Sequence, residues 1–246
     1  MSYIIIGHRG NKENYTENTL AGFKSALEID NINGIELDVV VSRDKQLFIS
    51  HDLFLKYNGQ IVFFHTLDYK QILALSNDKS KYPLLDDTLA LFGEYNENAS
   101  KIILIELKSW PAFDHIALIT KPRIEEIHAM LDKYGIIQKS YLISFDYRLL
   151  QDSHVLNPDV RTGLILHRNL LPLVPLIHSL NISLLVMERS WITAEQVKEM
   201  QVYMIDIFAW APNDTKEWTR LETLGVAGII TDKPKTLGLF KKVSKK

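Results

Sequence analysis

The sequence of 246 residues contains no cysteine and no large excess of charge of either sign. Without cysteine the chain has no disulfide bond, no thiolate metal ligand and no cysteine nucleophile. Its 28 lysine and arginine residues nearly balance 30 aspartate and glutamate residues, so the formal net charge of -2 creates no basic field that attracts nucleic acid. These shortages exclude a disulfide-stabilised fold and argue against a nucleic-acid partner.

Long apolar segments are also missing, because no stretch reaches the length that spans a bilayer. The first seven residues, MSYIIIG, lack the positive charge of a signal peptide, and their apolar run is too short for one. We expect this segment to be a buried strand and the protein to be cytoplasmic. The basic segment 241–246 is expected to be a solvated chain end without stable membrane anchoring, since one short basic cluster rarely holds a protein on a membrane.

The chain does contain an alternation of short β-branched runs with longer segments of helical period. Strands that alternate with helices indicate a parallel sheet of the α/β class. About eight such units in this length favour a closed (β/α)₈ barrel, the TIM barrel fold, in a single domain that spans residues 1–246. The strands are predicted at residues 3–7, 34–41, 47–50, 102–108, 141–144, 162–166, 183–187, 204–210 and 228–231.

The first helix is predicted from Leu20, Phe23 and Leu27, which fall on one helical face. Asn14 and Glu17 precede it with the three-residue spacing of a capping pair. We therefore expect these two residues to cap the first helix.

Residues 47–82 interrupt the alternation with an extra strand and an aromatic, turn-rich segment around Asn58-Gly59. We interpret about residues 52–82 as a small insertion after the second barrel strand. Loops that follow the C-terminal ends of barrel strands build the active sites of barrel enzymes. The insertion is therefore expected to lie over the mouth of the barrel.

Carboxylates recur at the ends of two predicted strands. The strand period of two places Glu36 and Asp38 on one face, and Glu106 and Lys108 share a face of a later, otherwise apolar strand. For the first pair alone, a solvated edge strand is an equally good interpretation. Three carboxylates that converge in a barrel mouth, however, require a cation to stay ionised. Oxygen ligands alone favour one divalent cation, Mg²⁺ or Ca²⁺, over zinc.

Two histidines also follow predicted strands. His8 precedes Arg9, a side chain suited to phosphate binding, and His51 precedes Asp52. Two histidines beside a metal cluster fit acid–base chemistry on a phosphate ester. Asp52 favours a protonated His51 and Arg9 a neutral His8, but neighbouring side chains on a strand point apart, so acid and base stay unassigned. The remaining histidines are expected to be surface or packing residues: His65, His115, His128, His154, His167 and His178.

Seven short motifs follow one another along the chain: His8-Arg9-Gly10, Glu17-Asn18-Thr19, Glu36-Leu37-Asp38, His51-Asp52, Glu106-Leu107-Lys108, Ser144-Phe145-Asp146 and residues 225–234 (GVAGIITDKP). This ordered series covers nearly the whole chain and resembles that of the glycerophosphodiester phosphodiesterases. The resemblance implies a (β/α)₈ barrel with an insertion after the second strand. It implies a divalent cation held by Glu36, Asp38 and Glu106, and an acid–base pair formed by His8 and His51.

The same resemblance implies that Arg9 and Lys108 bind the phosphate. Phe54, Tyr57 and Trp210 are candidates for the walls of the pocket that takes the alcohol. Departures from the family pattern lie mainly on the pocket side, at residues 53–59 and 210–213, whereas the catalytic positions match. The sequence thus predicts the class of reaction more sharply than the substrate.

The predicted function is metal-dependent hydrolysis of a small-molecule glycerophosphodiester to sn-glycerol 3-phosphate and an alcohol. The nucleophile is either water or the neighbouring glycerol hydroxyl, which would first form a cyclic phosphate. One alternative is a lysophospholipase D-type phosphodiesterase on the same barrel. Another is a non-catalytic barrel that binds a phosphoryl ligand, although the presence of both histidines and all three carboxylates argues against it. The sequence leaves the head group, the choice of Mg²⁺ or Ca²⁺ and the oligomeric state open.

Overall fold

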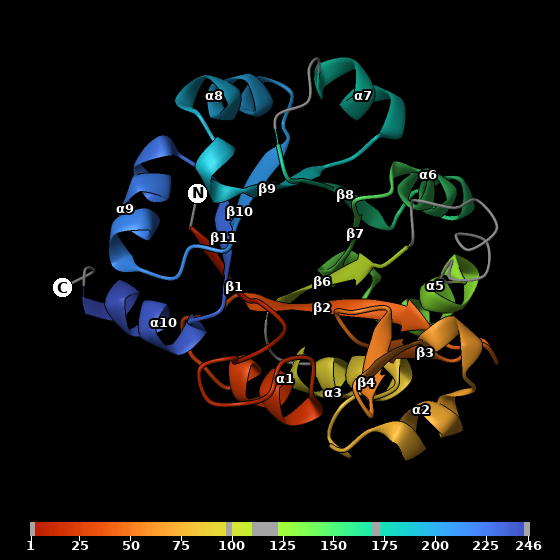
Figure 1. Ribbon diagram of the computed structural model, residues 1–246. Helices are drawn as coiled ribbons and strands as arrows, with labels where there is room; N and C mark the ends of the chain where they lie inside the picture. Colours follow the sequence, from red (N-terminus) through yellow and green to blue (C-terminus); the bar gives the residue numbers. More distant parts are fainter. Residues whose placement is uncertain (1–2, 97–99, 110–122, 169–172, 244–246) are drawn as a thin grey trace.

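The computed structural model describes residues 3–96, 100–109, 123–168 and 173–243. Viewed along its axis, a ring of parallel strands is surrounded by helices (Figure 1). The ring closes because β1 pairs with both β2 and β11, which confirms the predicted (β/α)₈ barrel. The barrel strands are β1 (Ile4–Gly7), β2 (Gly34–Val41), β6 (Ile102–Leu107), β7 (Ser140–Ser144), β8 (Arg161–Leu166), β9 (Leu184–Glu188), β10 (Asp206–Trp210) and β11 (Gly228–Thr231).

The interior of the barrel is filled by every second residue of the strands. Ile6, Ile165, Val186, Phe208 and Ile230 come from five different strands and belong to one buried apolar cluster. Because side chains alternate along a strand, the residue two positions further on points inward at the C-terminal mouth. The apolar layer therefore supports a second layer of side chains, which lines the mouth.

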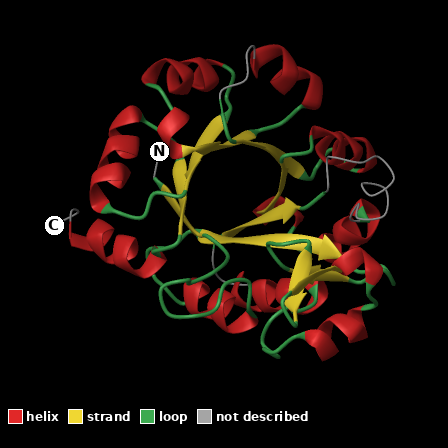
Figure 2. Ribbon diagram, in the orientation of Figure 1, coloured by secondary structure: helices red, strands yellow, loops and turns green. Residues whose placement is uncertain are grey.

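The helices cover the outer faces of the strands (Figure 2). Two further apolar clusters lie between the strands and this helical layer. None of the helices in the described part of the chain combines the length and apolar character needed to cross a membrane. The helices are α1 (Leu20–Leu27), α2 (Tyr69–Leu75), α3 (Leu85–Asn96), α5 (Ile124–Lys133), α6 (Tyr147–Leu156), α7 (Leu173–Leu180), α8 (Ala194–Val202), α9 (Thr215–Leu224) and α10 (Pro234–Val243), with short 3₁₀ turns at Phe64–Thr66, Ile137–Lys139 and Arg189–Trp191.

Helix α1 begins differently from the prediction. Thr19, and not Asn14 or Glu17, is the N-terminal cap, and its hydroxyl accepts a hydrogen bond from the backbone N–H of Gly22 at 3.1 Å. The predicted capping pair is therefore wrong. The chain makes a turn between residue 14 and the helix, and this turn releases the side chain of Glu17 for the contacts described below.

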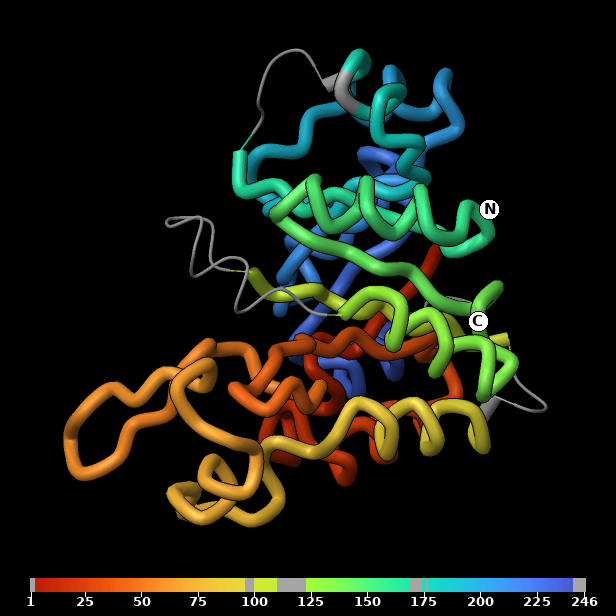
Figure 3. Tube along the Cα trace, turned by 90° about the vertical axis from the view of Figure 1, so that its right-hand side faces the viewer, coloured from red at the N-terminus to blue at the C-terminus, as the bar shows by residue number. Residues whose placement is uncertain are grey.

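The segment after β2 forms a small substructure with its own core. The extra strand is confirmed as β3 (Leu47–Ile49), which pairs antiparallel with β2. It is followed by a hairpin of β4 (Phe54–Tyr57) and β5 (Gln60–Phe63), which the sequence analysis did not identify as strands. Asn58 and Gly59 form its turn, both with positive φ. In Figure 3 this orange segment projects on the side of the C-terminal mouth, beside β2.

Candidate active site

A cavity of about 290 Å³ opens at the C-terminal ends of the barrel strands. One side of its lining is charged and the other is apolar. A larger cavity of about 870 Å³ lies at the opposite end, near the first residues of β10 and β11. Barrel enzymes build their sites at the C-terminal end, so the smaller cavity is the candidate active site. The titratable residues of its lining include His8, Arg9, Glu36, His51, Glu106 and Lys108.

Three carboxylates converge beside this cavity. Glu36 and Asp38 come from β2, and Glu106 lies on β6 directly opposite Asp38. One oxygen from each of these buried residues lies within 4.8 Å of the other two. Burial and the charge of Asp38 raise the pKa of Glu36 well above its ordinary value and that of Glu106 to about 7. Burial and mutual repulsion make it unfavourable for these three carboxyl groups to ionise together. A hard divalent cation bound by their oxygens would offset that repulsion.

Two cationic side chains lie against the same carboxylates. Lys108 Nζ is 2.9 Å from Asp38 Oδ1 and 2.6 Å from Glu106 Oε1, and Arg9 Nε is 3.2 Å from Asp38 Oδ2. The amide of Asn18 donates a further hydrogen bond to Asp38 Oδ2 at 2.8 Å. Burial alone would raise the pKa of Asp38, but Lys108 and Arg9 hold it far below its ordinary value. Asp38 is thus the permanent anion of the cluster.

A tight turn after β1 brings Arg9 to the cavity. Arg9 has a positive φ of 54°, an uncommon conformation for a side chain of this size. Its backbone N–H donates to Glu36 Oε2 at 3.0 Å, and its guanidinium donates to Glu17 Oε1, also at 3.0 Å. A Cβ at Gly10, whose φ is 87°, would lie 2.8 Å from the backbone of Gly22. The turn therefore requires glycine at position 10.

The two predicted catalytic histidines have different surroundings. His8 Nδ1 is 2.6 Å from Asp232 Oδ1, and its Nε2 faces Glu36 at 3.9 Å. The side chain of His51 is 41% exposed and contacts Asp52 at 3.0 Å. Burial, followed by the charges of Lys108 and Arg9, lowers the pKa of His51 despite Asp52. The expected effect of Asp52 on the protonation of His51 is thus outweighed.

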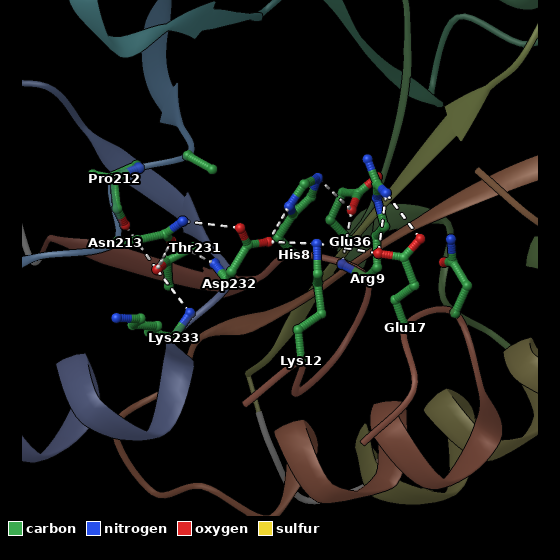
Figure 4. Close-up of polar contacts among 12 residues, drawn as sticks. His8, Arg9, Lys12, Glu17, Glu36, Pro212, Asn213, Thr231, Asp232 and Lys233 are labelled. Carbon is green, nitrogen blue, oxygen red and sulfur yellow. Dashed lines mark hydrogen bonds and ion pairs between the residues drawn. The ribbon is translucent and has the colours of Figure 1, made fainter. Parts of the chain in front are cut away.

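Asp232 is a residue of this site to which the sequence analysis assigned no role, although it lies in the motif at residues 225–234. Asn213 donates a hydrogen bond to its second oxygen at 2.9 Å, and Lys12 lies 2.9 Å from Oδ1 (Figure 4). His8, Lys12 and Asn213 together lower the pKa of Asp232 although burial opposes them. The strand period could have indicated this residue. Ile230 faces the barrel interior, and Asp232, two positions later, therefore points inward at the mouth.

The apolar side of the cavity carries an aromatic wall, defined here as Phe145, His167 and Trp210. The rings of Phe145 and His167 stack with centroids 4.8 Å apart, and Trp210 meets His167 edge-on at 5.1 Å. Trp210 was a predicted pocket residue and does line the cavity. His167, predicted to be a surface or packing residue, is exposed and packs on both rings, and it also lines the cavity. Strand period again supplied a signal, since His167 follows inward-facing Ile165.

The other predicted positions lie nearby or elsewhere. Phe54 lines a smaller adjoining cavity of about 90 Å³ together with His51 and Asp52. Tyr57, at the end of β4, is 40% exposed and lines neither cavity. Of the histidines expected to pack or face solvent, His128 is buried against Ser153, and His115 lies outside the described residues.

Comparison with known proteins adds independent findings. The model of the glycerophosphoryl diester phosphodiesterase family matches residues 8–236. A glycerophosphodiester phosphodiesterase of Caldanaerobacter subterraneus subsp. tengcongensis is 28% identical, covering 96% of this chain and 97% of its own. One of Bacillus altitudinis is 27% identical, with 94% of each chain covered.

Solved structures share the fold. The glycerophosphodiester phosphodiesterase of Thermotoga maritima has a TM-score of 0.71 at 25% identity, with 99% of each chain covered. A phosphodiesterase of Oleispira antarctica, in complex with the product sn-glycerol-3-phosphate, has a TM-score of 0.81 at 18% identity, covering 99% of this chain and 97% of that chain.

Proposed function

The chain belongs to the glycerophosphoryl diester phosphodiesterase family, and we propose that it hydrolyses glycerophosphodiesters to sn-glycerol 3-phosphate and an alcohol. One observation carries the proposal: a single cavity is lined by His8, His51 and two cationic side chains, and a cluster of three carboxylates lies beside it. The product complex of the Oleispira antarctica phosphodiesterase supports the choice of substrate.

Glu36, Asp38 and Glu106 would hold one divalent cation, Mg²⁺ or Ca²⁺. The bound cation would withdraw negative charge from the phosphate oxygens as a Lewis acid. Arg9 and Lys108 lie against the same carboxylates, and their remaining N–H groups would bind the phosphate and stabilise the charge that grows in the transition state.

His8 and His51 would move the protons. One ring nitrogen takes the proton of the attacking hydroxyl, from water or from the glycerol hydroxyl beside the phosphate. The other histidine gives a proton to the leaving alcohol oxygen as its bond to phosphorus breaks. The contact of Asp232 with Nδ1 of His8 turns Nε2 toward the carboxylates, and therefore toward the place of the reacting phosphate.

The alcohol group would lie against Trp210, with Phe54 and Tyr57 of the insertion as further candidates. An apolar wall of this kind also suits a lysophospholipase D-type substrate, which carries an acyl chain. A non-catalytic phosphoryl-binding barrel is disfavoured, because both histidines face the same cavity as the carboxylates. A cytoplasmic location remains a prediction.

The decisive experiment measures the head-group alcohol released from several glycerophosphodiesters and from a lysophospholipid. The second product is glycerol 3-phosphate from the glycerophosphodiesters and lysophosphatidic acid from the lysophospholipid. Each reaction is run in EDTA and then with Mg²⁺ or Ca²⁺ added back. We expect release from glycerophosphodiesters that stops in EDTA and returns with a cation. Release of alcohol from the lysophospholipid alone would support a lysophospholipase D-type phosphodiesterase. Tight binding of the diesters without release would support a non-catalytic phosphoryl-binding barrel.

A further inference from the structure

Lys12 lies on the loop between β1 and α1 and touches two carboxylates at once. Its Nζ is 2.9 Å from Asp232 Oδ1 and 3.1 Å from Glu17 Oε2 (Figure 4). Asp232 follows the last barrel strand, whereas Glu17 lies on the same loop as Lys12. The side chain of Lys12 is 25% exposed, so the ammonium is held in a partly covered position.

Each of these carboxylates holds one functional side chain. Asp232 Oδ1 accepts from His8 Nδ1 at 2.6 Å, and Glu17 Oε1 accepts from Arg9 Nη1 at 3.0 Å. The contacts therefore form a continuous chain of five residues, from Arg9 through Glu17, Lys12 and Asp232 to His8. Lys12 stands at its centre and is not among the residues that line the cavity, and its two recorded ion pairs go to Glu17 and Asp232.

We propose that Lys12 is a positioning residue that sets the phosphate-binding guanidinium of Arg9 and the imidazole of His8 relative to each other. The proposal rests on the function proposed above. One ammonium between two carboxylates restrains both, and each carboxylate in turn restrains its partner. Without the ammonium of Lys12, the side chains of Glu17 and Asp232 gain freedom to turn toward water, because they are 37% and 27% exposed. Small misplacement of groups that must act together on one phosphate slows the reaction strongly.

The two ends of the chain of contacts are held unequally. Asp232 retains Asn213 on its other oxygen, and the backbone N–H of Asp232 donates to Asn213 Oδ1 at 3.0 Å. Glu17 has only the side chains of Arg9 and Lys12 among the hydrogen bonds and ion pairs recorded for the described residues. Loss of Lys12 should therefore disturb Arg9 more than His8, and raise KM for the phosphodiester as well as lower kcat.

The first test compares Lys12→Met with Lys12→Arg and with Lys24→Met, which removes an exposed lysine from α1. Assays use the full chain at saturating cation. We expect Lys12→Met to lower kcat/KM about tenfold, divided between KM and kcat. Lys12→Arg, which can still span both carboxylates, should recover most of this loss, and Lys24→Met should match the parent. A Lys12→Met enzyme that matches Lys24→Met would overturn the proposal.

The second test uses double-mutant cycles with Glu17→Gln and Asp232→Asn. If Lys12 acts through these residues, adding Lys12→Met to Glu17→Gln should change KM little further, and adding it to Asp232→Asn should change kcat little further. Effects that multiply independently in both cycles would contradict the proposal. If Lys12→Met folds poorly in a thermal melt, Lys12→Gln replaces it in both cycles.

A third measurement separates this proposal from the proposed function. The Nδ1–H proton of His8, held by Asp232, should give a distinct downfield NMR signal, assigned by its loss in His8→Gln. Lys12→Met should broaden or shift that signal, whereas Lys24→Met should not. A parent protein inactive on every phosphodiester would refute the proposed function, while the signal would still test the positioning role. An unchanged signal with unchanged kinetics in an active enzyme would refute the positioning role alone.

Discussion

The two sides of the barrel mouth are built from the same strand geometry but carry opposite kinds of side chain. On β2 and β6 the inward positions above the apolar layer are Glu36, Asp38 and Glu106. The equivalent positions are His167, directly after β8, and Trp210, the last residue of β10, and their rings pack on each other. The charged side depends on compensating cations, whereas the aromatic side is stabilised by packing. We infer that reaction class resides on the first side and substrate choice on the second, so that each can be altered without the other.

Removing the cation is the strongest test of the charged side. EDTA should abolish turnover of every substrate alike, and Glu36→Gln should weaken cation binding because it removes one anionic ligand. Cation at a hundred times its Kd should stabilise the fold by about 2.7 kcal/mol, measured as a higher Tm. Full activity with no metal detected by elemental analysis would refute the metal site. A loss of activity in EDTA that differs between head groups would contradict the separation of reaction class and substrate choice between the two sides of the mouth.

Replacing either histidine should have the next largest effect. His8→Ala and His51→Ala should each lower kcat on the order of a hundredfold or more, the usual contribution of a general acid or base. A p-nitrophenyl phosphodiester needs no acid, because its leaving group departs unprotonated, so it should rescue only the variant that lacks the acid. As controls, circular dichroism should show that each variant keeps the fold, and cation titration should show that it keeps its affinity for the cation. Equal rescue of both variants, or losses of a few-fold, would contradict the acid–base pair.

Changes in the aromatic wall should act on substrate ranking instead. Phe145→Ala removes the ring that stacks on His167, and we expect kcat/KM ratios between head groups to shift about fivefold, the equivalent of about 1 kcal/mol. The requirement for the cation should stay the same. Tyr57→Ala, measured alongside, tests the sequence prediction for the insertion. A uniform loss over all head groups in Phe145→Ala would mean that the wall does not select substrates.

The smallest expected effect is the titration of His51. Burial, Lys108 and Arg9 lower its pKa, so in the folded protein it stays neutral at pH values where an ordinary histidine is protonated. Since the folded-state pKa lies below the unfolded value, its contribution to stability is present above about pH 6.5 and is lost as the pH falls through the folded pKa. NMR titration, with His51→Gln for assignment, should give a midpoint below 6.5. A midpoint above 6.5 would show that Asp52 dominates.

Much of this architecture could be predicted because strand period is a local property. Buried β-branched runs indicated the barrel strands, and carboxylates at the ends of two such runs indicated the cluster that the structure brings together. Asp232, Phe145 and His167 were equally accessible, since each follows an inward-facing residue by two positions. Phe145 and Asp232 stood within motifs without a role of their own, because the contacts that define their roles, with His167 and His8, join strands distant in the sequence.

The loop after β1 was beyond this kind of reasoning. The positive φ of Arg9 reverses the chain, and the path back to Thr19 places Glu17 beside Arg9 instead of at a helix cap. Backbone reversals of this kind depend on tertiary contacts, here the packing of Gly10 on Gly22, which no local pattern encodes. The contact between Lys12 and Asp232 depends in addition on the closure of the whole barrel.

That closure has a consequence for how the protein is made. His8 and Asp232 are 224 positions apart in the chain, yet they share a hydrogen bond because β1 pairs with β11. A growing chain therefore carries His8 long before it gains Asp232. Bringing such distant segments together is entropically slow. Formation of this contact and closure of the barrel are thus one event, so the orientation of His8 that we propose for catalysis requires the closed barrel.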